Sequence, residues 1–145
     1  MPVTTIGLSS TAKKPYSLIP ITIARISGLY EEAIAESQKV LQAMPDSTAG
    51  LTELAYSLAA GGRPPEARRI LQRLKEKSKH DWVPAYNLAV IHVALNEKET
   101  ALHYLQKAYQ ERDWAMMVLA VEPRLDPVRS NSNFQELLGK CRLPL

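Results

Sequence analysis

The chain of 145 residues has a single cysteine, few aromatic residues and no long apolar run. With only Cys141 present, an internal disulfide framework and a zinc site built from cysteines are excluded. The aromatic residues are two Trp, six Tyr and one Phe, so the many Ala and Leu favour helices over a β-sandwich. No run reaches the roughly 20 apolar residues that cross a bilayer. We therefore expect no membrane span and a cytoplasmic location.

Residues 1–30 contain no acidic residue. Acid-poor starts rich in Ser occur in transit peptides, but a basic, acid-poor start is also common by chance. Pro15 and Pro20 interrupt the apolar residues of this stretch, and no clean cleavage site follows, which disfavours a secretory signal. We expect an irregular N-terminal arm over residues 1–20 that leads into a helix.

The following part of the chain repeats itself every 34 residues. The three segments in register begin at Gly28, Gly62 and Asn96. Each has an alanine at its sixth position: Ala33, Ala67 and Ala101. The pattern predicts pairs of antiparallel helices joined by tight turns, because Gly, and after it Asn, tolerates the positive φ of such a turn. The alanines are expected where two helices cross closely.

A helical hairpin that recurs every 34 residues with these alanines resembles the tetratricopeptide repeat. The resemblance covers about residues 14–115 and implies an all-α fold, a short superhelix of about three helical hairpins. It divides residues 21–115 into a partial hairpin over 21–47 and complete ones over 48–81 and 82–115. The first helix of the partial hairpin is expected to be short and to begin near Pro20, because a proline inside a helix costs about 3 kcal/mol.

Residues 116–145 leave the repeat pattern and are expected to form a capping segment. The sequence predicts a short helix, a turn around Pro123 to Pro127 and a terminal helix over about residues 131–141, with Ser130 or Asn131 as its N-cap. A repeat array needs such a cap because its last hairpin otherwise exposes an apolar face. The tail also resembles the ends of tetratricopeptide arrays in larger bacterial regulators and kinases. That resemblance implies that the chain, or its ancestor, is the detached tail of a longer protein.

No constellation of catalytic residues stands out. Neither His92 nor His103 has a carboxylate at a metal-site spacing, and we interpret them as a packed and a surface histidine. Cys141 falls in the apolar stripe of the last predicted helix, where a buried and inert thiol is expected. The sequence has no nucleophile elbow and no glycine loop that would cradle a phosphate. We predict a protein that is not an enzyme and that holds no cofactor or metal.

Positive charge is concentrated in residues 63–80. Seven bases and two acids give this segment a net charge of +5, whereas eleven bases and thirteen acids give the rest of the chain −2. The predicted basic patch consists of Arg68, Arg69, Arg73 and Lys75. A solvated outer helix face is enough to account for it. An acidic partner is the alternative, and nucleic acid is disfavoured because no aromatic residues interleave with the bases.

The resemblance to tetratricopeptide repeats also implies a function, since arrays of this family generally bind peptides in a concave groove lined by first helices. The residues that we place in that groove are Thr52, Tyr56, Tyr86, Asn87, Val90 and Val93. The basic members of the family's carboxylate clamp are missing, and the remaining surface suits an apolar segment. We therefore predict a protein–protein interaction scaffold.

Two alternatives for the groove stay open at this stage. The protein's own N-terminal arm or terminal helix fills it, or a second copy of the chain does so in a homodimer. If the groove is open, Tyr86→Ala combined with Val90→Asp is expected to abolish partner binding and to leave helicity intact.

Overall fold

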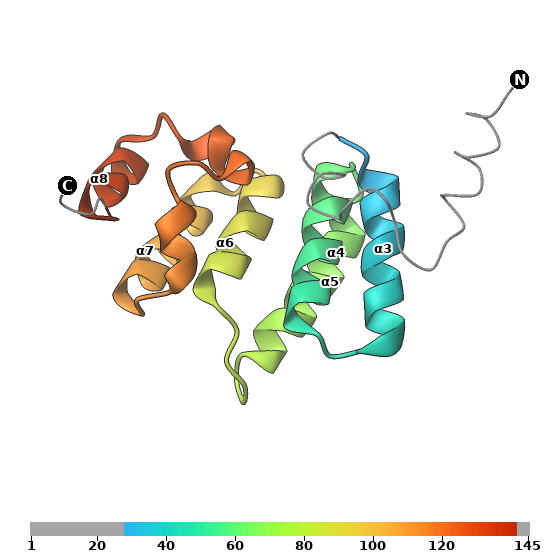
Figure 1. Cartoon of the computed structure of the whole chain (residues 1–145). Helices are drawn as coiled ribbons and strands as arrows, with labels where there is room; N and C mark the ends of the chain where they lie inside the picture. The colour runs from blue at the N-terminus through green and yellow to red at the C-terminus, as the bar shows by residue number, and fades with distance from the viewer. Residues whose placement is uncertain (1–27, 142–145) are drawn as a thin grey trace, which may run out of the picture.

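The computed structural model describes residues 28–141, so the predicted arm over 1–20 and the predicted first helix near Pro20 lie outside the described residues. Within that range the chain is all-α, as predicted (Figure 1). The α-helices are α3 (Tyr30–Ala43), α4 (Thr48–Ala60), α5 (Pro64–Lys77), α6 (Ala85–Ala94), α7 (Lys98–Gln110) and α8 (Ser132–Cys141). Two 3₁₀ helices, η1 (Trp114–Val118) and η2 (Pro123–Val128), lie between α7 and α8.

The predicted turn residues adopt the left-handed backbone conformation. Gly28, Gly62 and Asn96 have φ of 78°, 86° and 61°. At the end of α4 the amide of Arg63 donates to the carbonyl of Leu58 at 2.8 Å, which closes the turn around Gly62. The repeat of this conformation at positions 62 and 96 reverses the chain in the same way at the end of α4 and of α6.

Antiparallel packing of neighbouring helices follows from these turns. Helix α4 packs against α3 and α5, and α6 packs against α7. The alanines at the sixth position of each segment, Ala33, Ala67 and Ala101, are completely buried, as the close helix crossings require. Helix α4 also packs against α6, which stacks one hairpin on the next from α3 to α8 (Figure 1).

Helix α6 is apolar on nearly its whole circumference. Its sequence is AYNLAVIHVA, and of its ten residues all but Asn87 and Ala94 are buried. A helix of this kind needs neighbours on several sides. They are α4 and α7, together with η2 from the C-terminal segment.

The capping segment differs in detail from the prediction. The stretch expected to be a short helix and a proline turn forms η1 and η2. Asn131 is the residue that caps α8, because its Oδ1 accepts hydrogen bonds from the amides of Asn133 (2.8 Å) and Phe134 (3.4 Å). Phe134 and Leu137, which share a helical stripe with Cys141, are buried.

The burial predicted for Cys141 is wrong, because its thiol is half-exposed. It lies in the last turn of α8, at the edge of the core rather than within it. Partial burial still raises the pKa of the Cys141 thiol, which keeps it protonated at neutral pH.

Candidate protein-binding surfaces

The predicted groove residues lie together on α4 and α6, but most of them are buried. Tyr86 is 3% and Val90 0% exposed, and Thr52 and Val93 are buried as well. Tyr56 on α4 and Asn87 on α6 are the two that remain half-buried. The structure therefore places four of the six side chains inside the core and two at its surface.

The C-terminal segment is the element that covers this face of α6. Leu125 and Val128 of η2 are buried in the same apolar cluster as Tyr86 and Val90. Helix η2 packs against both α6 and α7. This element was not among the occupants considered from the sequence: the terminal helix α8 packs against α7, and the N-terminal arm lies outside the described residues.

Arg124 ties η2 to the second repeat. Its guanidinium lies 3.6 Å from the carboxylate of Glu53 on α4 and also pairs with Glu122. The same group lies 5.9 Å from the centre of the Tyr56 ring. Arg124 therefore joins η2 to α4. We call the half-buried pair Tyr56 and Asn87, on the neighbouring first helices α4 and α6, the concave strip.

The Tyr86 hydroxyl is enclosed beneath this strip. Burial raises the pKa of Tyr86 to about 12, with Asp113 adding to the rise and Arg124 opposing it. The phenol therefore stays neutral at every physiological pH. Because it is buried, Tyr86 belongs to the core beneath the concave strip and not to the accessible surface.

The predicted basic patch lies on α5, and its members interact with different neighbours. Arg68 pairs with Glu97 at 3.3 Å, the Lys75 ammonium lies 5.8 Å from the centre of the Tyr104 ring, and Arg73 donates to a backbone carbonyl of the α3–α4 turn at 3.3 Å. Arg69 is exposed. These contacts join α5 to the α3–α4 and α6–α7 turns and to α7, and the four side chains are spread along the helix.

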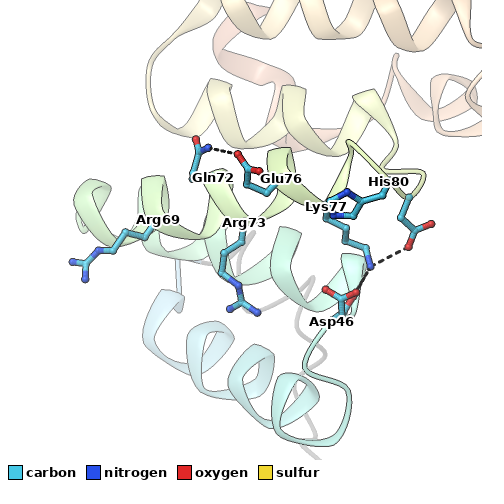
Figure 2. A pocket seen from close by; sticks show the side chains of 8 residues that line it. Asp46, Arg69, Gln72, Arg73, Glu76, Lys77 and His80 are labelled. Atoms are coloured by element: carbon cyan, nitrogen blue, oxygen red, sulfur yellow. Dashed lines mark hydrogen bonds and ion pairs between the residues drawn. The ribbon is translucent and has the colours of Figure 1, made fainter.

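A shallow pocket of about 560 Å³ opens beside Arg69 and Arg73 (Figure 2). Lys77 lies between two carboxylates, 2.6 Å from Asp46 and 3.2 Å from Asp81, and the bond to Asp46 is the main cause that raises the pKa of Lys77. The lining residues are Asp46, Arg69, Gln72, Arg73, Glu76, Lys77, His80 and Asp81. With three bases and three acids among them, the pocket has little net charge with which to attract an anion.

His92 is buried, as the sequence interpretation proposed. Its Nδ1 lies 3.0 Å from a carboxylate oxygen of Glu97, and its ring stacks on Tyr104 with the centroids 5.3 Å apart. Burial lowers the pKa of His92, and Lys75 lowers it further, whereas the bond to Glu97 opposes the shift. Among residues 28–141, no three His, Cys, Asp or Glu side chains lie close enough together to hold a metal ion.

Acidification is expected to destabilise the protein through His92. Unfolded chains take up a proton on this histidine below its ordinary pKa of 6.5, but the folded protein resists protonation. Stability should therefore fall as the pH drops from about 6.5 toward the lowered pKa. His92→Asn cannot titrate, and its side-chain amide nitrogen takes the position of Nδ1 beside Glu97, so its urea midpoint should fall less over that range. Equal pH slopes for the two proteins would exclude this role of His92.

An apolar cleft that the sequence reasoning missed opens between the end of α7, η1 and α8. Its volume is about 910 Å³. We call it the C-terminal cleft; its main lining residues are Tyr109, Trp114, Met116, Met117, Leu138 and Cys141. A signal for it exists in the sequence, since residues 114–121 are apolar without interruption. A short helix packed on one side cannot bury eight consecutive apolar side chains.

Residues 24–89 match the family model for the tetratricopeptide repeat. Over these residues the chain is similar to the tetratricopeptide repeat family. The matched range contains α3, α4, α5 and the beginning of α6, whereas η2 and the C-terminal cleft lie beyond it. Searches among curated proteins and among solved structures found no match for the chain.

Tetratricopeptide repeats generally serve as scaffolds for protein–protein interaction and are generally not enzymes, so protein partners are indicated for this chain. Of the helices that the structure describes, none has the length and apolar character to cross a membrane.

Proposed function

We propose that this protein is a non-enzymatic scaffold that binds a segment of a partner protein along its concave side, at Tyr56 and Asn87. The observation that carries the proposal is that these two, from neighbouring first helices, are the predicted groove residues that are not buried. Thr52, Tyr86, Val90 and Val93 support them from below. The proposal includes a cytoplasmic location, in which Cys141 stays reduced.

The amide of Asn87 is held in place for such a contact. Its Nδ2 donates to the hydroxyl of Thr52 at 3.1 Å, and that hydroxyl donates in turn to the carbonyl of Thr48 at 2.8 Å. A side-chain amide has two N–H donors and an acceptor oxygen. The second N–H and the oxygen of Asn87 are therefore suited to pair with the backbone of a bound segment.

Tyr56 supplies the apolar part of the contact. Its ring lies beside the Arg124 guanidinium, and a half-exposed aromatic ring next to an arginine is a combination enriched at interface hot spots. The strip also contains the carboxylate of Glu53. It is narrower and more polar than the apolar groove expected from the sequence, so the preferred segment should combine an apolar side chain with polar neighbours.

Peptide selection tests the proposal. Peptides are selected from a random display library on the immobilised full chain, and their affinities are then measured by titration in solution. Tyr56→Ala combined with Asn87→Ala should lower the affinity for peptides that bind at the concave strip by about a hundredfold. The reason is that two hot-spot residues contribute roughly 3 kcal/mol or more to the free energy of binding. Glu99→Ala, on the exposed outer face of α7, is the matched control and should leave affinity unchanged. If no selected peptide loses affinity for the double variant, the concave strip is not the binding surface.

A further inference from the structure

Large apolar side chains protrude from the C-terminal cleft on a firmly anchored element. Trp114 and Met117, which line the cleft, are 73% and 78% exposed, and Val121, which follows the lining residues in sequence, is 73% exposed. Met116 and Leu119, from the same stretch, are buried and hold η1 and the turn after it on the core. The exposed side chains are therefore presented from a fixed backbone.

The composition of the cleft is that of a binding surface rather than of ordinary exposed surface. Trp and Tyr are the residue types most enriched at interface hot spots, and Trp114 and Tyr109 both line the cleft. Met116 and Met117 add flexible thioether side chains, which adapt to apolar partners of different shape. Monomeric proteins rarely expose a contiguous apolar patch of this kind without a function for it.

Two basic side chains lie at the rim of the cleft. Within the described range Arg112 forms no ion pair, and Lys140 pairs only with the exposed carboxylate of Glu136 at 3.7 Å. The third charged residue of the lining, Asp113, is buried, and its Oδ1 accepts the amide of Ala115 at 3.0 Å as the cap of η1. The accessible charge at the rim is therefore positive and complements carboxylates.

A helix fits this cleft better than an extended segment does. An extended segment needs partners for its backbone, from the edge of a sheet or from polar side chains; residues 28–141 form no strand, and the lining of the cleft is mainly apolar. A helix satisfies its backbone internally and can lay an apolar face into a hydrophobic cleft.

We propose that the C-terminal cleft binds an amphipathic helix of a partner protein, whose apolar face covers Trp114 and Met117 and whose carboxylates pair with Arg112 and Lys140. This surface is separate from the concave strip at Tyr56 and Asn87. With both surfaces occupied, the protein joins two partners rather than holding one.

Tryptophan fluorescence provides a direct readout, because the chain has two tryptophans and only Trp114 lines the cleft. In the full chain carrying Trp82→Phe, Trp114 is the sole indole. The probe is a short synthetic amphipathic helix with leucines along one face and glutamates at both edges of that face. Binding should saturate and shift Trp114 emission to shorter wavelength, since the indole leaves water. The same peptide with lysines in place of the glutamates should bind about tenfold or more weakly at low salt, because like charges then meet at the rim.

Two variants separate the contributions of apolar contact and of charge. Met117→Ser changes an exposed side chain. It should lower the affinity for the glutamate peptide about tenfold without affecting the fold. Arg112 has φ of 56°, a conformation that glycine adopts without strain, so Arg112→Gly removes the guanidinium from a backbone that glycine fits. This variant should bind the glutamate peptide about tenfold more weakly and narrow the preference over the lysine peptide.

The control is the concave-strip variant, Tyr56→Ala with Asn87→Ala, which should bind the probe like the unmodified protein. Loss of probe binding in that variant, equal affinity for the two peptides, or the absence of a shift in Trp114 emission would each overturn the proposal. Sedimentation of the chain alone at two concentrations tests a second copy as the occupant. Self-association that disappears in Met117→Ser would show that the cleft is a dimer interface and not a partner site. Failure here leaves the concave strip untouched, because that proposal is tested by different variants.

Discussion

Val90→Asp is expected to unfold the third hairpin instead of merely closing a binding surface. Val90 is completely buried, in the apolar cluster that α6 shares with η2. A carboxylate without a partner at such a position costs at least about 3 kcal/mol, a large part of the roughly 5–15 kcal/mol that stabilises a typical domain. Urea denaturation followed by far-UV circular dichroism should show a markedly lower midpoint and reduced helicity before urea is added.

Two matched variants identify the cause of this loss. Val90→Ala removes apolar volume without adding charge and should cost only about 1–3 kcal/mol. Ala49→Asp places the same carboxylate on an exposed position of α4 and should change stability by no more than about 0.5 kcal/mol. Unchanged helicity and an unchanged midpoint in Val90→Asp would mean that this face of α6 is open to solvent.

Because α6 is buried, substitutions of its buried residues test stability rather than binding. Tyr86→Ala with Val90→Asp was expected to leave helicity intact, but both side chains are buried. A loss of binding in that variant would therefore report unfolding. Tyr56 and Asn87 are partly exposed, so binding can be tested at these positions with less disturbance of the core, and the urea midpoint of the variant is measured beside its affinity.

Phe134→Ala is expected to detach the C-terminal cap. Phe134 is completely buried, and truncation of a buried phenylalanine typically costs about 3–5 kcal/mol. Its ring also lies 5.6 Å from the Arg129 guanidinium, which donates to the carbonyls of Ala120 and Glu122 at 2.8 Å each. Since Arg129 holds the turn between η1 and η2, the substitution should increase hydrogen exchange of backbone amides throughout residues 114–141.

Asn133→Ala is the control for this substitution, because the Asn133 side chain is exposed one position earlier in the same helix. It should change the urea midpoint only slightly, within about 0.5 kcal/mol in free energy. If Phe134→Ala is no more destabilising than Asn133→Ala, α8 does not cover the last hairpin in solution.

The hairpin architecture could be predicted from the sequence because it depends on residues that are close together in the chain. Gly62 and Asn96 recur at the interval of one repeat, and each adopts the positive φ that a tight turn demands. Ala67 and Ala101 recur at the same interval and lie at the helix crossings. Such signals act within one hairpin, so they can be recognised without knowledge of what packs against it.

The filling of the groove could not be predicted from the sequence, because it depends on contacts between distant parts of the chain. Helical spacing placed Tyr86 and Val90 on one side of α6, but it could not show that η2 packs against α6. The contact of Arg124 with Glu53 joins the capping segment to the second repeat across the third. In η2 itself, the apolar residues Leu125 and Val128 are three positions apart, and three residues are one turn of a 3₁₀ helix. From the sequence this segment was interpreted as a turn.

The C-terminal cleft was missed for a different reason. Apolar residues in the tail were assigned to the cap as a group, although a cap needs only one buried face. The structure buries Met116 and Leu119 and leaves Trp114, Met117 and Val121 exposed. An excess of apolar residues over what a short element can bury is therefore the sequence signal for a second surface.

Nuclear Overhauser effects between the side chains of α6 and those of η2 test the central claim most directly. The claim is that the chain's own C-terminal segment fills the concave face beside α6, which leaves the strip at Tyr56 and Asn87. Cross-peaks between the buried side chains of α6, which include Tyr86 and Val90, and the methyl groups of Leu125 and Val128 are the predicted result, since η2 packs against α6. Absence of these cross-peaks, with Val90 methyl groups accessible to a soluble paramagnetic probe, would contradict the claim and restore the open groove.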